Sequence, residues 1–263
     1  MPPRLSKLYP APRTGTELPP IFTLRTLGLP VGSALGASLC AVLGWSGPAW
    51  ALAGVSAVTF VQLLAPAIRQ RSLSGDGWLA EVGFAAPFLL FFAPYVAWCV
   101  MFPPSFRPAP VWIVVAIAGA VALRLTELSR LRLGFDRELL ELMPPLRRST
   151  LLLRSYQTMA AAVGQELFYR GALFVLLAPV LGWGVVPVSA ALFVGEHWSN
   201  RWAATMFTTP YLVRISALAL GLGVIAYASG SVVPAIVGHV AYNLAPVMQG
   251  LRHRRVNPYI PII

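Results

Sequence analysis

Three short polar islands interrupt the apolar second half of this 263-residue sequence. They contain two of the three histidines and the only two acidic residues that follow position 141. A carboxylate, guanidinium or imidazole is costly to place in hydrocarbon, so such residues indicate a functional site by default. The islands read Gln165-Glu166-Leu-Phe-Tyr-Arg170, Phe193-Val-Gly-Glu196-His197 and His239-Val-Ala-Tyr-Asn243.

The first island predicts an ion pair. Glu166 and Arg170 lie four residues apart, which places both on one face of a helix. Pairing lowers the cost of burying the two charges. A buried, paired carboxylate can activate water as a general base or can anchor the bundle, and the spacing leaves both uses open.

The second and third islands supply imidazole and amide groups. His239 and Asn243 share a helical face by the same spacing, and His197 lies in another apolar segment. Together, these groups can hold a water molecule or stabilise an oxyanion. Adjacent helical residues point about 100° apart, so we expect Glu196 to miss the target of His197 and to line the aqueous mouth of the site.

A metal centre is the less favoured chemistry. Two histidines with one or two glutamates could bind zinc, but the HExxH pattern is absent from the sequence. We therefore expect no cofactor and no metal ligand, with zinc as the alternative. Cys40 and Cys99 both fall in apolar segments, where they are typical of buried small hydrophobes rather than of a disulfide or a metal pair.

The composition indicates a polytopic membrane protein. The chain is 57% hydrophobic and 11% charged, whereas soluble domains carry roughly 25% charged residues. The net charge of +11 does not predict nucleic-acid binding, because the basic residues lie in loops between apolar spans. These residues instead act as topology signals and contact anionic headgroups.

We predict an all-α bundle of about eight transmembrane helices over residues 27–250, with cytoplasmic tails at 1–26 and 251–263. This topology puts 17 of the 20 basic residues on the cytoplasmic side. The segment 128–150 mixes arginine with leucine and predicts an amphipathic interfacial helix. The expected spans are 27–45, 48–68, 78–101, 110–127, 153–178, 185–200, 213–229 and 231–250.

In these motifs the chain resembles the CAAX protease and bacteriocin-processing (Abi) family of intramembrane proteases. The family carries Glu-Glu-x-x-x-Arg, Phe-x-x-x-His and His-x-x-x-Asn, in that order, on separate membrane helices. The resemblance covers about 160–250, within a protease-like motif region at about 153–250. It implies an all-helical bundle in which a glutamate activates water for peptide hydrolysis, while histidines and asparagine place the water and the oxyanion. It makes Glu166 the second acid, Arg170 its partner, and His197, His239 and Asn243 the polar cluster.

Gln165 departs from the family pattern, because it stands where the first acid is expected. A carboxamide cannot accept a proton as a general base. Four explanations remain open: Glu166 serves as the base, Glu196 supplies the carboxylate, the chain is a relative that binds without cutting, or the glutamine is a deliberate substitution that removes the base.

These observations predict an intramembrane endopeptidase that acts on a membrane-associated protein or its C-terminal segment. The alternative is a non-catalytic binding, immunity or sorting protein on the same scaffold. A small transporter is less favoured, because no internal repeat is visible. We expect an integral protein of a bacterial inner membrane with both termini in the cytoplasm. Its expected partners are the lipid bilayer and a membrane-associated peptide or protein, and we expect it to bind no nucleic acid.

Overall fold

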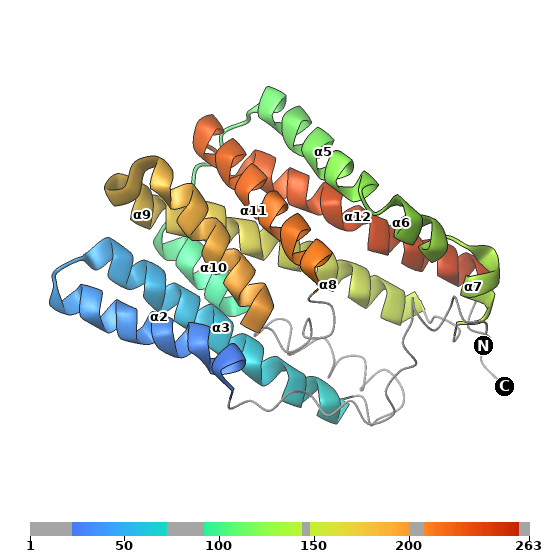
Figure 1. Cartoon of the computed structure of the whole chain (residues 1–263), viewed down its shortest axis with the longest axis horizontal. Helices are drawn as coiled ribbons and strands as arrows, with labels where there is room; N and C mark the ends of the chain where they lie inside the picture. The colour runs from blue at the N-terminus through green and yellow to red at the C-terminus, as the bar shows by residue number, and fades with distance from the viewer. Residues whose placement is uncertain (1–22, 73–91, 144–147, 200–207, 258–263) are drawn as a thin grey trace.

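The computed structural model describes residues 23–72, 92–143, 148–199 and 208–257. These residues form helices joined by turns and contain no β-strand. Figure 1 shows the helices packed side by side in an elongated bundle. The predicted all-α membrane bundle is thus confirmed, while residues 78–91 of the third expected span lie outside the described part of the chain.

Candidate membrane spans can be identified among the described helices. Within the described residues, three helices are long and apolar enough to cross a membrane: Leu24–Val42, the bent stretch Leu151–Ser199, and Thr209–Ser229. A fourth qualifies if Pro110–Leu125 and Leu128–Gly134 form one span. The count of eight therefore stays a prediction.

The N-terminal half contributes a helical hairpin that packs on the motif region. Helix α2 (Leu24–Val42) and helix α3 (Ser46–Ser72) lie against each other, and α3 also contacts α9 (Leu173–Leu181). Gly54 of α3 permits the close approach of Trp98, from the helix Phe92–Met101, and of Phe168: a Cβ atom there would lie 2.5 Å from the Trp98 indole nitrogen and 2.8 Å from the Phe168 ring.

The first motif lies in the middle of one long helical stretch. Helix α8 (Arg148–Glu166) continues into a π-helical segment, η1 (Leu167–Ala172), and then into α9. A single 3₁₀ turn, η2 (Gly182–Gly184), reverses the chain into α10 (Val185–Ser199), which carries the second motif. Gly182 has a φ of 53°, a left-handed conformation that glycine adopts without steric cost.

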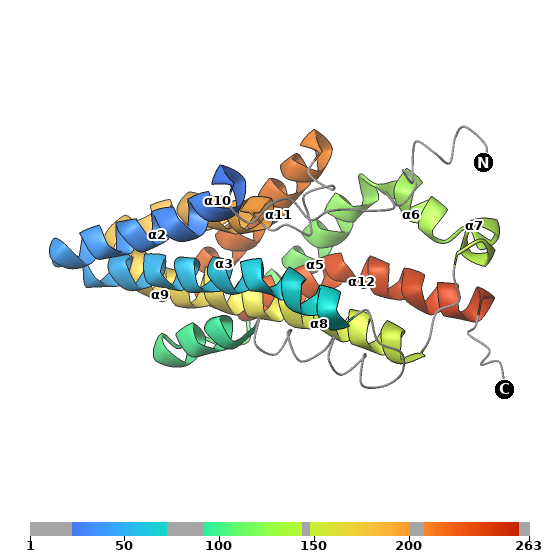
Figure 2. The same ribbon diagram turned by 90° about the horizontal axis from the view of Figure 1, so that it is seen from below.

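The third motif is placed by the last helical pair. Helix α11 (Thr209–Ser229) ends at Gly230, whose φ is 61°. Helix α12 (Val233–Val256) follows, and it packs on α8 and on α5 (Pro110–Leu125). In Figure 2, α12 and α8 run side by side along the molecule. Helix α10 contacts η1, and α12 packs on α8, so the three motif-bearing elements meet inside the bundle.

The expected amphipathic helix over 128–150 is wrong as a single element. The chain forms α6 (Leu128–Gly134) and a short α7 (Arg137–Glu141), and α6 is bent by 80° from α5. The Asp136 side chain accepts a hydrogen bond from the Leu139 amide, so it caps the start of α7. This N-cap signal breaks the predicted helix into two.

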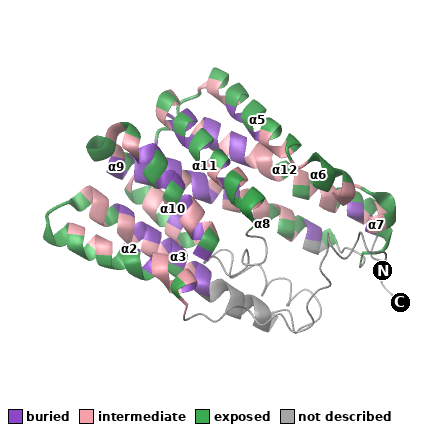
Figure 3. Ribbon diagram, in the orientation of Figure 1, coloured by how far each residue is buried: buried purple, intermediate pink, exposed green. Residues whose placement is uncertain are grey.

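Burial follows the same arrangement. In Figure 3, buried residues lie in the middle of the bundle, and the outer faces of α2 and α5 are mostly exposed. Those faces carry large apolar side chains: Leu24 is 85% exposed and Val111 is 71% exposed. Contiguous exposed apolar surface marks an interaction site or a membrane face, so these outer helices suit contact with lipid.

Candidate active site

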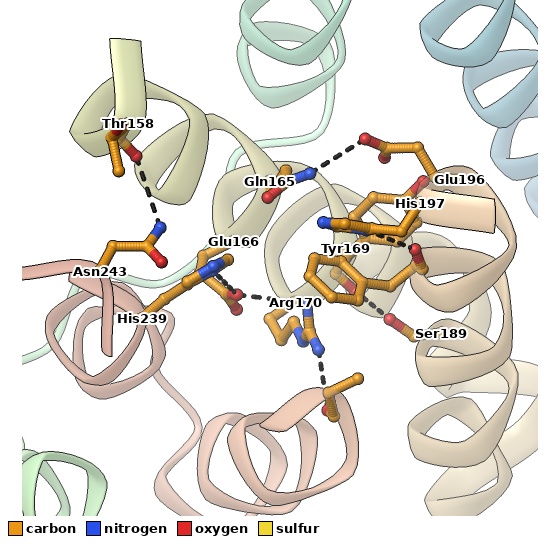
Figure 4. Close-up of polar contacts among 12 residues, drawn as sticks. Thr158, Gln165, Glu166, Tyr169, Arg170, Ser189, Glu196, His197, His239 and Asn243 are labelled. Carbon is orange, nitrogen blue, oxygen red and sulfur yellow. Dashed lines mark hydrogen bonds and ion pairs between the residues drawn. The ribbon is translucent and has the colours of Figure 1, made fainter. Parts of the chain in front are cut away.

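Figure 4 shows side chains from α8, η1, α10 and α12 pointing toward one another. Gln165, Glu166 and Arg170 come from the end of α8 and from η1. Helix α10 provides Phe193, Glu196 and His197, and helix α12 provides His239 and Asn243. The three sequence islands therefore meet in space, and one contact joins Glu166 to His239, which lie 73 positions apart in the sequence.

Glu166 lies at the centre of an ionic cluster. Its side chain is fully buried, and Oε1 lies 3.3 Å from Arg170 Nη1 and 2.7 Å from His239 Nδ1. The second guanidinium nitrogen, Nη2, donates to the Ala219 carbonyl of α11 over 2.8 Å. The predicted Glu166–Arg170 contact is present, and Arg170 ties the motif helix to α11.

The π-helical segment η1 begins immediately after Glu166 and contains Arg170. Such segments widen the helical turn and frequently occur at functional sites. Gly171 within it faces Pro104, so closely that a Cβ atom would lie 3.0 Å from the proline ring. The widened turn thus lies where the segment that contains Pro104 packs against the motif helix.

Hydrogen bonding fixes the orientation of both imidazoles. A carbonyl or carboxylate oxygen only accepts hydrogen bonds. His197 Nδ1 lies 2.9 Å from the Phe193 carbonyl oxygen, and His239 Nδ1 lies 2.7 Å from the Glu166 carboxylate. In each ring Nδ1 therefore carries the hydrogen. A neutral imidazole then has Nε2 left as an acceptor, the arrangement that a water-binding histidine needs.

Phe193 is the shared packing surface of the motifs. Its ring lies 4.4 Å from the His197 ring and 5.9 Å from the His239 ring, measured between centroids. The Arg170 guanidinium carbon lies 4.6 Å from the Phe193 centroid, within the range of a cation–π interaction. Phe193 is fully buried, so one rigid ring aligns residues from all three islands.

Glu196 is not at an aqueous mouth, contrary to the expectation from its position in the sequence. It is only 1% exposed. Its Oε1 accepts hydrogen bonds from Gln62 Nε2, from Tyr95 Oη at 2.8 Å and from Gln165 Nε2 at 3.0 Å. The one-residue offset from His197 turns the carboxylate toward α3 and the helix Phe92–Met101, where these buried donors satisfy it.

Asn243 takes a different partner from the one its motif suggests. Its Nδ2 atom points to the Thr158 carbonyl of α8 at 3.5 Å, at the limit of a hydrogen bond. The side chain is half-buried. The structure thus brings Asn243 to the edge of the site, hydrogen-bonded to the backbone of α8.

Gln62 and Tyr95 were missed by the sequence analysis. Both are buried and bind the Glu196 carboxylate, with Gln62 also 2.9 Å from Tyr95 Oη. Each lies in a long apolar segment without a charged neighbour in the sequence. The only available signal was the burial cost of Gln62 itself, because an amide inside a span needs a partner.

Within the part of the chain that the structure describes, no three His, Cys, Asp or Glu side chains gather in a way that could hold a metal ion. The contacts around Glu166 and Glu196 come mainly from arginine, amide and phenol groups. These side chains bind carboxylates and are not the usual ligands of zinc.

Residues 147–245 match the family described as Type II CAAX prenyl endopeptidase Rce1-like. The matched segment contains all three motifs, so the resemblance predicted from the sequence is confirmed. It excludes α2, α3, the helix Phe92–Met101 and α5, and with them Gln62 and Tyr95. No curated protein and no solved structure matches the chain.

Proposed function

We propose that this integral membrane protein hydrolyses a peptide bond in a membrane-associated protein or its C-terminal segment. The match of residues 147–245 to the Rce1-like CAAX prenyl endopeptidase family supports this proposal. One observation carries the proposal: His239 of the third motif lies 2.7 Å from Glu166 of the first, beside the ring of Phe193 from the second. Residues that the chain separates widely thereby form one buried polar centre.

The proposed reaction needs a carboxylate base and acceptors that hold water. The oxygen of the water adds to the carbonyl carbon, and its proton passes to a glutamate. The C–N bond then breaks, and the proton is delivered to the leaving nitrogen. The Nε2 atoms of His197 and His239 orient the water, and Glu166 holds the His239 ring in place. This chemistry requires no cofactor.

Asn243 is proposed to stabilise the oxyanion of the tetrahedral intermediate together with the polar cluster. Its amide would have to turn away from the Thr158 carbonyl, and the 3.5 Å bond it gives up is a weak one. A donor of this kind contributes about 10²–10³-fold to the rate when it reaches the oxyanion.

The charge distribution and the exposed apolar side chains support a location and a topology for the protein. The basic bias of the loops supports a bacterial inner membrane protein with both termini in the cytoplasm. Apolar side chains on α2 and α5 support contact with the bilayer. A membrane-associated peptide or protein is the proposed partner, and nucleic acid is not.

A second candidate function rests on Gln165. Its amide donates to Glu196 and cannot act as a base. The chain would then be a non-catalytic protein that binds, protects or sorts a membrane-associated peptide on the protease scaffold. This candidate predicts that His197→Ala leaves the biological phenotype intact.

A cleavage assay separates the two candidates. The purified chain in liposomes is mixed with a pool of farnesylated and unlipidated peptides with free C-termini, and the products are read by mass spectrometry. We expect cleavage by the natural chain and a loss of about 100-fold in His197→Ala, because the attacking water loses an acceptor that places it. The matched control is His253→Ala, a histidine about 20 Å from His239 along α12. A natural chain that binds a peptide without cutting it favours the second candidate.

A further inference from the structure

The two oxygens of the Glu196 carboxylate have different surroundings. Oε1 accepts three hydrogen bonds, from Gln62, Tyr95 and Gln165. Oε2 is buried without a close hydrogen-bond partner, although the buried Tyr169 hydroxyl interacts with this carboxylate. A buried acceptor without a partner is uncommon and calls for an explanation, and Oε2 of Glu166 is another one. In Glu196 the three donors fix one oxygen, which leaves Oε2 as the atom that can accept a proton.

Gln165 links this carboxylate to the proposed reaction. The side chains of glutamine and glutamate have nearly the same shape, so Gln165 occupies the place of the first acid in the family motif. Its Nε2 lies 3.0 Å from Glu196 Oε1. The carboxylate missing from position 165 therefore reappears one hydrogen bond away, on a different helix.

The two positions also constrain each other. With a glutamate at 165, two carboxylates would stand about 3 Å apart, and they could not both be ionised without strong repulsion. A carboxamide avoids this repulsion and donates to Glu196 instead. A glutamine at position 165 is thus the residue expected beside the Glu196 carboxylate of α10.

We propose that Glu196 is the general base of this chain in place of the missing carboxylate at position 165, and that Gln62 and Tyr95 are positioning residues for it. The proposal rests on the proposed endopeptidase function. Glu196 Oε2 takes the proton of the attacking water as the oxygen adds to the peptide carbonyl carbon. It returns that proton to the leaving nitrogen as the C–N bond breaks.

The proposal gives the N-terminal half of the chain a role in catalysis. Gln62 lies on α3 and Tyr95 on the helix Phe92–Met101, outside the segment that matches the protease family. By binding Oε1 they fix the plane of the carboxylate. A base must be held in this way for its proton transfer to be efficient.

A reciprocal exchange tests the proposal. Cleavage of the farnesylated and unlipidated peptide pool is measured for the natural chain, Glu196→Gln, Gln165→Glu and the double variant Gln165→Glu/Glu196→Gln. We expect Glu196→Gln to lose about 100-fold or more. The double variant should regain at least about tenfold over Glu196→Gln, because it returns a carboxylate to the family position. Gln165→Glu alone should cut more slowly than the natural chain, because it adds like-charge repulsion.

The double variant also controls for misfolding, since it keeps the Glu196→Gln change and restores one carboxylate. Activity of Glu196→Gln within about threefold of the natural chain overturns the proposal. So does a natural chain that cuts nothing while Gln165→Glu cuts, although the protease function of the scaffold then survives. If none of the four proteins cuts any peptide, the proposed function fails together with the inference.

Discussion

Two buried carboxylates lie in this bundle with opposite kinds of partner. Glu166 contacts a guanidinium and an imidazole, whereas Glu196 is held by two carboxamides and a phenol. A buried charge must be paired or hydrogen-bonded. The chain uses both solutions in adjacent places, because Gln165, the neighbour of Glu166 in the sequence, donates to Glu196. Buried acidity alone therefore does not identify a base, because one acid is paired with cations and the other is bound by neutral donors.

The ionic region should depend most strongly on its cation. Arg170→Met leaves the Glu166 charge buried without its guanidinium, which we expect to cost about 3–5 kcal/mol of unfolding free energy. Unfolding in mixed micelles measures the loss. The matched control is Arg137→Met, which removes an exposed i,i+4 pair with Glu141 worth about 0.3–0.5 kcal/mol. Equal losses in the two variants would contradict the difference drawn between buried and exposed pairs.

The hydrogen bonds to Glu196 should matter for the rate as well as for stability. Tyr95→Phe removes one of three donors to Glu196, and a hydrogen bond to a charged group is worth about 1.5–3 kcal/mol. We expect kcat to fall about tenfold with KM unchanged, since an extra rotational freedom of the base does not alter peptide binding. Steady-state kinetics on the cleaved peptide test this. A rise in KM with kcat intact would remove Tyr95 from the positioning role.

The edge of the site should matter least for stability. Asn243→Ala removes a half-buried amide whose one hydrogen bond is 3.5 Å long, so we expect less than about 1 kcal/mol of lost stability. The rate should fall by about 10²-fold if the amide reaches the oxyanion. Parallel unfolding and cleavage measurements check both numbers. Unchanged cleavage would leave Asn243 a spacer between α8 and α12.

The contacts that the sequence predicted are local or carried by the family motifs. The Glu166–Arg170 pair follows from i,i+4 spacing on one helix, and the helical fold follows from the apolar composition. The approach of His239 to Glu166 was predictable only through the family resemblance, because no local rule joins residues 73 positions apart.

The second carboxylate site could not be predicted in the same way. Gln62 and Tyr95 stand alone in apolar spans, and no spacing connects them with Glu196. Helical geometry did show that Glu196 diverges from His197, but it did not show where the carboxylate goes. That direction depends on how α3 and the helix Phe92–Met101 pack against α10, which is a tertiary property.

We propose that Glu166 stabilises the site and that Glu196 carries the chemistry. Unfolding free energy and kcat, measured side by side for Glu166→Gln and Glu196→Gln, separate these two roles. We predict that Glu166→Gln loses about 3 kcal/mol or more of stability, because Arg170 is left unpaired. Glu196→Gln should stay within about 2 kcal/mol of the natural chain while kcat falls about 100-fold or more. A Glu196→Gln variant that keeps its kcat, or a Glu166→Gln variant that keeps its stability, would contradict this division of roles.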